Sequence, residues 1–443
     1  MNFFSNLYKK SQDSKMINYR DNYYLNFLCT TVLLFPFFLL TGPFLPDLVI
    51  VICSISFIYF ILKYNLYNYL NKNYFKLFIF FWIYIVFTSL ISDNLFFSLK
   101  SSFFYLRFIL FSLFVLFLIK NFEFFLKNFF YALTIVLVIV LIDSYFQFYF
   151  GESLTGFDKP RLRLTGPFDD RQIVGSFISR ILPLYLFLFL YIYKKFDLKI
   201  LAFISILGIL VLLSGERTAF FLFSFFILGI FFLKSTNVLK FFLIIISYIF
   251  FFIIITLSSS NLKERIIDQT LQGMGIKKYE VTDGVKKYFD EKPKRGFYIF
   301  SRAHEVHYLT AYKMFLDSPF VGQGPNMFRK KCSDEKFFIE QSSCTMHPHN
   351  FLLQLLAETG LIGALFYFFI LFILLRQILS LIYNTKIKNI KLTNNNLNMF
   401  ILNMGFIINC FVFILPNGNF FNNYLNAIIF IPVGFYLLHR END

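Results

Sequence analysis

Charged residues are scarce in this sequence, and their scarcity excludes an ordinary soluble protein. Only 15% of the 443 residues are charged, whereas 57% are hydrophobic. Soluble domains carry about 25% charged residues, so much of this chain does not face water. Tryptophan is nearly absent, with 1 residue against 70 phenylalanines. Phenylalanine therefore fills positions that leucine fills elsewhere, and we attach no function to its rings.

Acidic residues are the rarer charge, with 26 Asp and Glu against 42 Lys and Arg. The resulting formal charge of +16 can indicate a nucleic-acid partner. Here, however, the basic residues lie in the connections between apolar runs, where they typically set membrane topology. No nucleic-acid partner is therefore expected. Met1 to Tyr24 is polar and basic, so no cleavable signal peptide is expected either.

Apolar runs of roughly 16 to 22 residues, long enough to cross a bilayer, recur along the chain. They predict an all-α, polytopic membrane protein with about 12 transmembrane helices. The predicted spans are 25–41, 45–62, 75–92, 102–119, 129–149, 173–193, 198–214, 218–233, 239–257, 361–382, 397–415 and 424–438.

Every second connection is rich in Lys and Arg, from the tail before the first span to Arg440 after the last. Basic connections stay in the cytoplasm, so both termini are predicted to be cytoplasmic. The chain then divides into a tail (1–24), nine spans (25–257), one long outward segment (258–360), and three spans with a short cytoplasmic tail (361–443).

Cys332 and Cys344 both lie in the long outward segment. Thiols oxidise outside the cytoplasm, and closing a loop of this size is worth roughly 3 kcal/mol. We expect a disulfide between them. The other cysteines, Cys29, Cys53 and Cys410, lie in predicted spans and are interpreted as packing residues.

His347, His349 and Asn350 lie where the outward segment meets an apolar run. Histidine can gain and lose a proton near neutral pH, so the cluster is a candidate for acid–base chemistry. A structural interpretation also stays open, because Asn350 is a good helix N-cap and Pro348 precedes it. A cap needs only one of these residues, so the cluster favours function.

Four ionisable residues lie within predicted spans or at their ends, where they are costly and usually functional. They are Arg107, Asp143, Arg180 and Arg217. Pairing of Asp143 with Arg107 or Arg180 is the structural alternative. More arginines lie in outward connections, namely Arg161, Arg163, Arg171 and Arg302. This excess of guanidinium groups over acids predicts an anionic ligand such as pyrophosphate.

Several stretches resemble the O-antigen ligase and polymerase superfamily. The first is His349-Asn350 followed by Gln354, Glu358 and Thr359-Gly360. The others are Arg163-Leu-Thr-Gly166-Pro-Phe, Ser214-Gly-Glu-Arg217, and Arg302 followed by Pro319-Phe-Val-Gly322-Gln-Gly324. Together they cover roughly residues 160–375. Two positions depart from the family: Phe221, where leucine is frequent, and His307, where tryptophan is frequent.

The resemblance implies a metal-independent glycosyltransferase, without a cofactor, on the periplasmic face of the bacterial inner membrane. Its donor is a glycan on undecaprenyl pyrophosphate. Its acceptor is a lipid A–core sugar in ligases, or another lipid-linked repeat unit in polymerases. We expect His349 to be the general base, with His347 as the less favoured choice, and Asn350 to position the loop. Arg217 and Arg302 are expected to hold the pyrophosphate, with Arg163 and Arg180 in support.

Three alternatives to the favoured ligase remain. A repeat-unit polymerase shares the same motifs. A protein-targeted oligosaccharyltransferase would use the same chemistry with a Ser, Thr or Asn acceptor. A non-enzymatic transporter of lipid-linked oligosaccharides would be expected to show internal repeats and charges near the membrane midplane. The sequence shows no such repeat, and its charges crowd one predicted face.

Overall fold

The computed structural model describes residues 19–441 except 161, 236, 277–296 and 413–414. The basic tail residues before Tyr19 lie outside the described part, as does the whole lysine-rich stretch from Lys277 to Arg295. The described residues form helices, turns and loops, without a strand. The predicted all-α class is therefore confirmed for this part of the chain.

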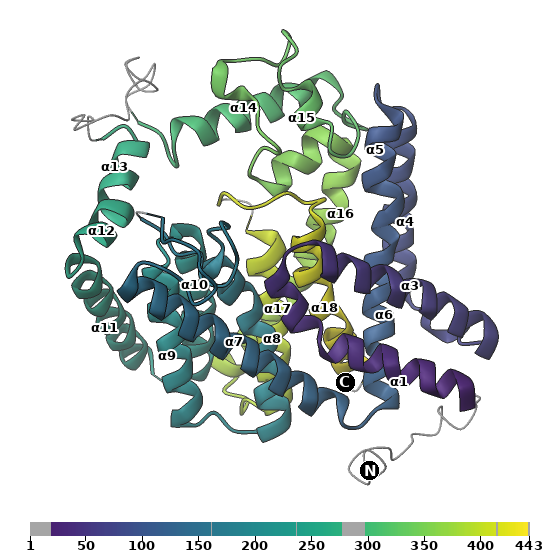
Figure 1. The fold of residues 1–443 in the computed structure, drawn as a ribbon, viewed down its shortest axis with the longest axis horizontal. Helices are drawn as coiled ribbons and strands as arrows, with labels where there is room; N and C mark the ends of the chain where they lie inside the picture. The colour runs from purple at the N-terminus through teal and green to yellow at the C-terminus, as the bar shows by residue number, and fades with distance from the viewer. Residues whose placement is uncertain (1–18, 161, 236, 277–296, 413–414, 442–443) are drawn as a thin grey trace.

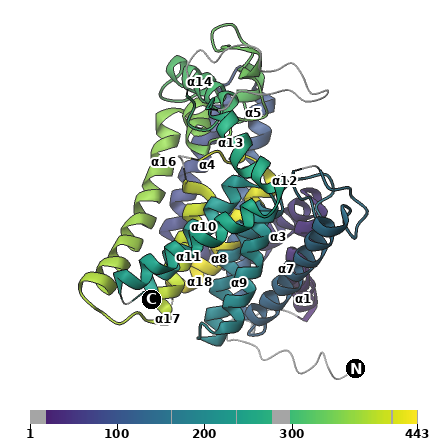
Figure 2. The ribbon, with the colours of Figure 1, turned by 90° about the vertical axis from the view of Figure 1, so that its left-hand side faces the viewer.

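The first eleven α-helices form most of the bundle in Figures 1 and 2. Their bounds are α1 (Tyr19–Leu33), α2 (Phe35–Phe38), α3 (Phe44–Tyr64), α4 (Asn73–Leu90), α5 (Leu95–Ser102), α6 (Leu106–Asn121), α7 (Phe125–Phe150), α8 (Val174–Tyr193), α9 (Leu198–Leu213), α10 (Arg217–Lys234) and α11 (Val238–Leu257).

Short helices then lead to the last three long ones. These elements are α12 (Ser260–Lys263), a π-helical turn η6 (Glu264–Asp268), α13 (Gln269–Gly273), α14 (Arg302–Asp317), α15 (Phe328–Lys331), a 3₁₀ turn η7 (Gln341–Ser343), α16 (Phe351–Ile382), α17 (Asn394–Phe406), a π-helical turn η9 (Ile407–Phe411) and α18 (Asn423–Glu441).

Helices α6 and α8 form the centre of the bundle. Both are apolar around nearly their whole circumference, which is typical of a helix enclosed by other helices. Helix α6 packs on α3 and α18, and α8 packs on α7, α10 and α17. Close approach of α18 to α6 depends on Gly434, because a Cβ there would lie 2.8 Å from the Ser112 carbonyl oxygen.

Each of the twelve predicted spans coincides with a helix or a helix pair, but only eight helices in the described chain are long and apolar enough to cross a membrane alone. A ninth span is possible at 25–41, where α1 and the following turns meet at a bend of 49°. Pro36 follows this bend and lacks the N–H that a continuous helix would use.

The other three predicted spans fall short for separate reasons. Helix α9, predicted as 198–214, has only 16 residues. The span predicted at 397–415 begins as the 13-residue α17 and continues as a π-helical turn. Helix α18, predicted as 424–438, is long enough but carries asparagine in its first turn and His439 in its last. A count of twelve spans therefore stays a prediction.

The long segment 258–360 gathers at one end of the bundle. In Figure 1 α14 and α15 lie close together, far from the labelled C-terminal end, and both helices contact α16. A small apolar cluster joins these three helices, with Ala311, Met314, Phe328 and Ala357 among its buried members. The candidate site lies along this end of the molecule. Its assignment to the periplasmic side of the membrane stays a prediction.

Candidate active site

Four of the five histidines in the chain form one cluster. His349 lies at its centre, with its ring centroid 4.2 Å from that of His347 and 5.5 Å from those of His304 and His307. Two of the rings come from α14 and two from the segment that enters α16. The structure thus brings together the two predicted histidines and two that the sequence analysis had not selected.

Helix α14 presents His304 and His307 on one face, because residues three apart lie side by side on a helix. Ser301 caps this helix, and its Oγ accepts a hydrogen bond from the His304 backbone N–H at 3.3 Å. The same Oγ lies 2.7 Å from His304 Nδ1, which fixes the ring. The Nδ1 atom of His307 is buried without a hydrogen-bond partner among the described residues. The signal for this pair was a serine cap followed by histidines three residues apart.

The backbone turn at His349 has a φ of 56°, in the left-handed region that few side chains adopt. Asn417 supports this turn from the far end of the sequence. Its backbone N–H donates to the His349 carbonyl oxygen at 2.8 Å, and its side-chain oxygen accepts from the Phe351 N–H at 3.0 Å. Asn350 is the N-cap of α16, with its side-chain oxygen accepting from the Leu353 N–H at 3.1 Å. Asn350 therefore caps the helix and thereby positions the turn.

Burial lowers the pKa of every histidine in the cluster. The pKa of His304 and that of His307 fall to about 4, chiefly because burial disfavours the charged ring and secondly because His349 is close. The pKa of His347 falls to about 3 for the same two reasons. Burial also lowers the pKa of His349. All four rings are therefore neutral at pH 7, which is the form that accepts a proton.

The turn between α9 and α10 directs two neighbouring charges in different directions. Glu216 accepts hydrogen bonds from the backbone N–H of Gly175 at 2.7 Å and from the Ser176 hydroxyl at 2.5 Å. Glu216 thus caps the N-terminus of α8 and does not form an ion pair with Arg217. Arg217 instead donates from Nη1 to the Thr270 hydroxyl of α13 at 2.7 Å.

A third arginine, which the sequence analysis missed, completes a cluster with Arg163 and Arg217. Arg265 in η6 is buried and donates from Nε to the Gly215 carbonyl oxygen at 3.1 Å. Its pKa falls to about 10, because of burial first and then the positive charges of Arg163 and Arg217. Three positive charges held this close together repel one another, and a bound anion would reduce that repulsion.

Close packing of this arginine cluster requires glycine at position 215. The φ of Gly215 is 72°, and a Cβ there would lie 2.5 Å from the Leu162 carbonyl oxygen and 3.3 Å from Cγ of Arg265. Any larger residue would separate the loop that carries Arg163 from the turn that carries Arg217. The Ser-Gly-Glu-Arg stretch therefore has a structural reason at each of its last three positions.

Helix α7 holds the loop that carries Arg163. The side-chain oxygen of Gln147 accepts from the backbone N–H groups of Thr165 and Gly166, both at 2.9 Å. Asp143, one turn earlier on α7, accepts from the Leu154 N–H at 2.6 Å. These contacts fix the loop backbone beside the arginine cluster before any ligand binds.

The proposed pairing of Asp143 with an arginine is wrong. Arg107 pairs instead with Asp47, at 2.8 Å between Nη2 and Oδ1. Arg180 is buried in α8 and donates from Nη1 to the Asn409 carbonyl oxygen at 2.8 Å. Its guanidinium group thus binds the backbone of η9. A structural role for Arg180 agrees better with this contact than ligand binding.

Arg302 lies at the start of α14, two residues before His304. Its Nη2 donates to Oε2 of Glu340 at 2.6 Å, so part of its charge is already compensated. This ion pair joins α14 to the loop that precedes the histidines. The same loop contains the disulfide between Cys332 and Cys344, whose Cα atoms are 5.1 Å apart. The predicted cysteine pair is thus present and lies directly before His347.

The two glycine motifs pack against each other backbone to backbone. Helix α16 kinks at Gly360, and a Cβ on Gly322 would lie 2.4 Å from the Glu358 carbonyl carbon. The Gln323 N–H donates to the Ala357 carbonyl at 2.9 Å, and the Gly324 N–H to that of Glu358 at 2.8 Å. The Pro-x-x-Gly-x-Gly turn and the Glu-Thr-Gly kink are therefore two halves of one joint that positions α16 under the histidines.

The charge of one arginine of the cluster, Arg217, reaches the histidine cluster. The positive charge of Arg217 contributes to the lowered pKa of His304, whose ring lies 5.5 Å from that of His349. Arg329, another residue that the sequence analysis missed, contributes in the same way to the lowered pKa of His347. The positive charges of two arginines thus reach the cluster of neutral imidazoles, Arg217 at His304 and Arg329 at His347. Such a pair of features suits attack by a hydroxyl on a carbon that bears an anionic leaving group.

The described residues contain no group of three or more His, Cys, Asp or Glu side chains arranged to hold a metal ion.

The family model described as O-antigen ligase matches residues 200–368. This match runs from α9 to the first half of α16 and supports the resemblance to the O-antigen ligase and polymerase superfamily that the motifs predicted. No curated protein matched the sequence.

Proposed function

We propose that this protein is a membrane glycosyltransferase that moves a glycan from undecaprenyl pyrophosphate to an acceptor hydroxyl. The observation that supports the proposal is a cluster of four histidines centred on His349, one of which, His304, is close enough to Arg217 to be affected by its charge, in a bundle of membrane-type helices. The favoured activity is that of an O-antigen ligase, with lipid A–core as the acceptor. The site would face the periplasm at the bacterial inner membrane, and both termini would face the cytoplasm.

In the proposed reaction His349 takes the proton of the acceptor hydroxyl as its oxygen bonds to C1 of the donor sugar. The bond between C1 and the pyrophosphate oxygen breaks, and its electron pair leaves with undecaprenyl pyrophosphate. Burial keeps His349 neutral at pH 7 and ready to accept this proton. The donor is already activated by its leaving group, so the chemistry needs no metal or cofactor in principle.

Arg217, Arg163 and Arg265 would stabilise the charge that develops on the departing pyrophosphate. The guanidinium groups of Arg217 and Arg265 are held by the Thr270 hydroxyl and the Gly215 carbonyl oxygen, and the backbone of the loop that carries Arg163 is held by Gln147, so little reorganisation is needed during the reaction. Arg302, whose charge is shared with Glu340, would support the site from the start of α14.

The test is transfer of a lipid-linked glycan by purified protein in lipid vesicles. His349→Ala should lower the rate by about 10²–10⁴-fold, the usual contribution of a general base. His439→Ala is the matched control, because this fifth histidine lies in α18, where it contacts the Asn395 carbonyl oxygen. Wild-type transfer by the His349 variant would contradict the base assignment.

The repeat-unit polymerase is the alternative within the same chemistry. A donor that carries one repeat unit separates the two, because a polymerase lengthens it without lipid A–core and a ligase requires that acceptor. In cells, loss of a ligase leaves full-length lipid-linked glycan, and loss of a polymerase leaves single repeats. A non-enzymatic transporter would move the lipid-linked glycan across the membrane and transfer none in either assay.

A further inference from the structure

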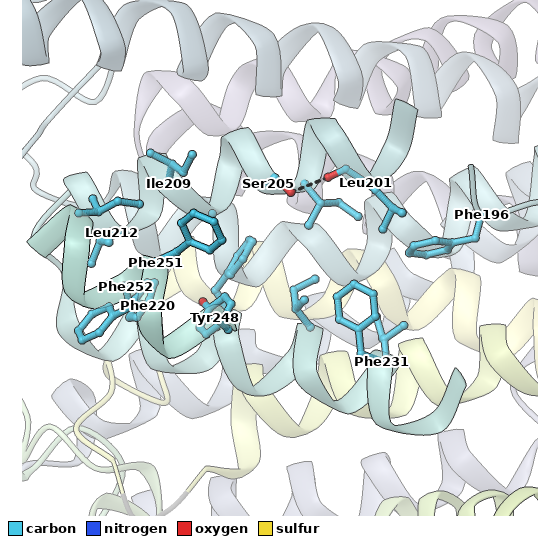
Figure 3. Close-up of a pocket in the computed structure, with 16 residues that line it drawn as sticks. Phe196, Leu201, Ser205, Ile209, Leu212, Phe220, Phe231, Tyr248, Phe251 and Phe252 are labelled. Atoms are coloured by element: carbon cyan, nitrogen blue, oxygen red, sulfur yellow. Dashed lines mark hydrogen bonds between the residues drawn. The ribbon is translucent and has the colours of Figure 1, made fainter. Parts of the chain in front are cut away.

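An apolar cavity of about 280 Å³ lies among α9, α10 and α11 (Figure 3). Leu212, Phe220 and Phe252 line one end, and Phe196 and Phe231 line the other. The cavity follows α10 for eleven residues, which corresponds to about 16 Å of helix. It is therefore long and narrow, as an extended hydrocarbon chain requires.

The few polar groups in the cavity wall are already hydrogen-bonded within the protein. The Tyr248 hydroxyl pairs with that of Ser224 at 2.7 Å, and the Ser205 hydroxyl donates to the Leu201 carbonyl oxygen at 2.9 Å. A polar ligand would find no partner here and would lose its hydration. The wall therefore selects an apolar occupant.

The cavity opens sideways, toward the apolar surface of the bundle. Phe251 and Ile209 line it and yet are 60% and 40% exposed. Helix α11, which forms this side, has only 6% of its most apolar stretch buried. A lipid chain could thus enter from the bilayer without crossing the packed core.

The Leu212 end of the cavity adjoins the arginine cluster. Phe220 lies three residues, or one helical turn, after Arg217, and Leu212 directly precedes the turn that contains Gly215. Helix α11 ends at Leu257 and leads through α12 to Arg265. An amphiphile with an anionic head at the arginines would therefore place its tail in this cavity.

We infer that the cavity holds the first part of the polyprenyl chain of the donor lipid. This inference rests on the proposed function, because it takes the anion at the arginines to be a polyprenyl pyrophosphate. The chain gains no hydrophobic free energy by leaving the bilayer, which is equally apolar. Its binding depends on packing against the aromatic wall, so filling the cavity removes it.

The test measures binding of undecaprenyl pyrophosphate without a glycan to the full chain in nanodiscs of phosphatidylethanolamine and phosphatidylglycerol. Ser205→Trp fills the cavity from an exposed position on α9. It should weaken the affinity for undecaprenyl pyrophosphate about tenfold. The affinity for dimethylallyl pyrophosphate, which has five carbons, should stay unchanged. Ala202→Trp is the matched control, because Ala202 is exposed on the same helix and does not line the cavity. It should change neither affinity.

Ile209→Trp fills the same cavity from another exposed position and should reproduce the result if the first variant folds poorly. Wild-type affinity of both variants for undecaprenyl pyrophosphate would overturn the inference and assign the cavity to bulk lipid. Equal loss of the long and the short ligand would also overturn it. The binding assay does not require glycan transfer. Absence of transfer by the wild-type protein therefore contradicts the proposed function alone. Normal transfer together with unchanged binding of undecaprenyl pyrophosphate by the cavity variants contradicts the cavity assignment alone.

Discussion

Replacing Gly360 with alanine should damage the joint that positions α16. Gly360 has a φ of 65°, and an added Cβ would lie 2.3 Å from both the carbonyl carbon and the oxygen of Phe320. Neither obstacle is the end of a flexible side chain, so the backbone itself must move. The Leu361 N–H, which donates to the Pro319 carbonyl at 2.8 Å, lies directly in the path of that shift.

Two costs combine at this position. Left-handed backbone costs an L-residue about 1–2 kcal/mol. Forced displacement of packed atoms costs about 1–3 kcal/mol more. The sum is about 2–5 kcal/mol, which is large against the usual stability of a protein. Because α16 carries the His349 turn at its N-terminus, the shift should also lower glycan transfer by about tenfold or more.

Gly151→Ala separates the two costs. Gly151 has a φ of 88°, but no heavy atom lies within 4 Å of the position that an added Cβ would take, so only the backbone cost remains. Thermal unfolding of both purified variants in the same detergent should show a clearly larger loss for Gly360→Ala. Transfer should fall only in that variant. Equal unfolding temperatures would refute the argument that the two glycine motifs form a packed joint.

Three further predictions concern the site itself. Arg217→Lys should remain poorly active although its charge is kept, because an ammonium group cannot make bidentate contacts with a phosphate; full activity would indicate a diffuse positive field instead. Burial lowers the pKa of His349, and protonation of this base inactivates it, so the kcat/KM for transfer should fall only at a pH below the ordinary histidine pKa of 6.5. A fall in kcat/KM that begins above pH 6.5 would contradict the neutral-base assignment. Cys332→Ser should lower the free energy of unfolding by roughly 3 kcal/mol through loss of the closed loop, as measured by denaturant unfolding, and maleimide labelling of both Cys332 and Cys344 in unreduced wild-type protein would rule out the disulfide.

The sequence predicted the helical class and the positions of the helices well, because long apolar runs leave few alternatives in a bilayer. It was less informative about α9 and α17. Hydropathy alone does not show that α9 is short or that a π-helical turn follows α17. The bend at Pro36 was also read as a continuous span. Each difference concerns local backbone geometry, to which a hydropathy average is insensitive.

The site was predicted in part. His349 and Arg217 were selected because histidine at a membrane boundary and arginine in a span are unusual. His307 and Arg265 were missed, because each lies on a helix of ordinary polarity and becomes significant only through its neighbours in the fold. Asn417 is 68 residues from His349, and no local pattern connects them.

Arg302 and Arg180 show what a sequence leaves out about a charge. Both were selected as arginines expected on the outward side, but the structure pairs one with Glu340 and the other with the Asn409 backbone. A sequence shows which charges are present, whereas only the fold shows which of them are already neutralised.

The rigid support of Arg163, Arg217 and Arg265 has a consequence for turnover. A setting that stabilises a diphosphate while its bond to the sugar breaks continues to attract it afterwards, because the cations do not relax away. In the proposed reaction, spent carrier lipid should therefore be a competitive inhibitor of the donor. Release of this product, rather than the chemical step, would then be rate-limiting.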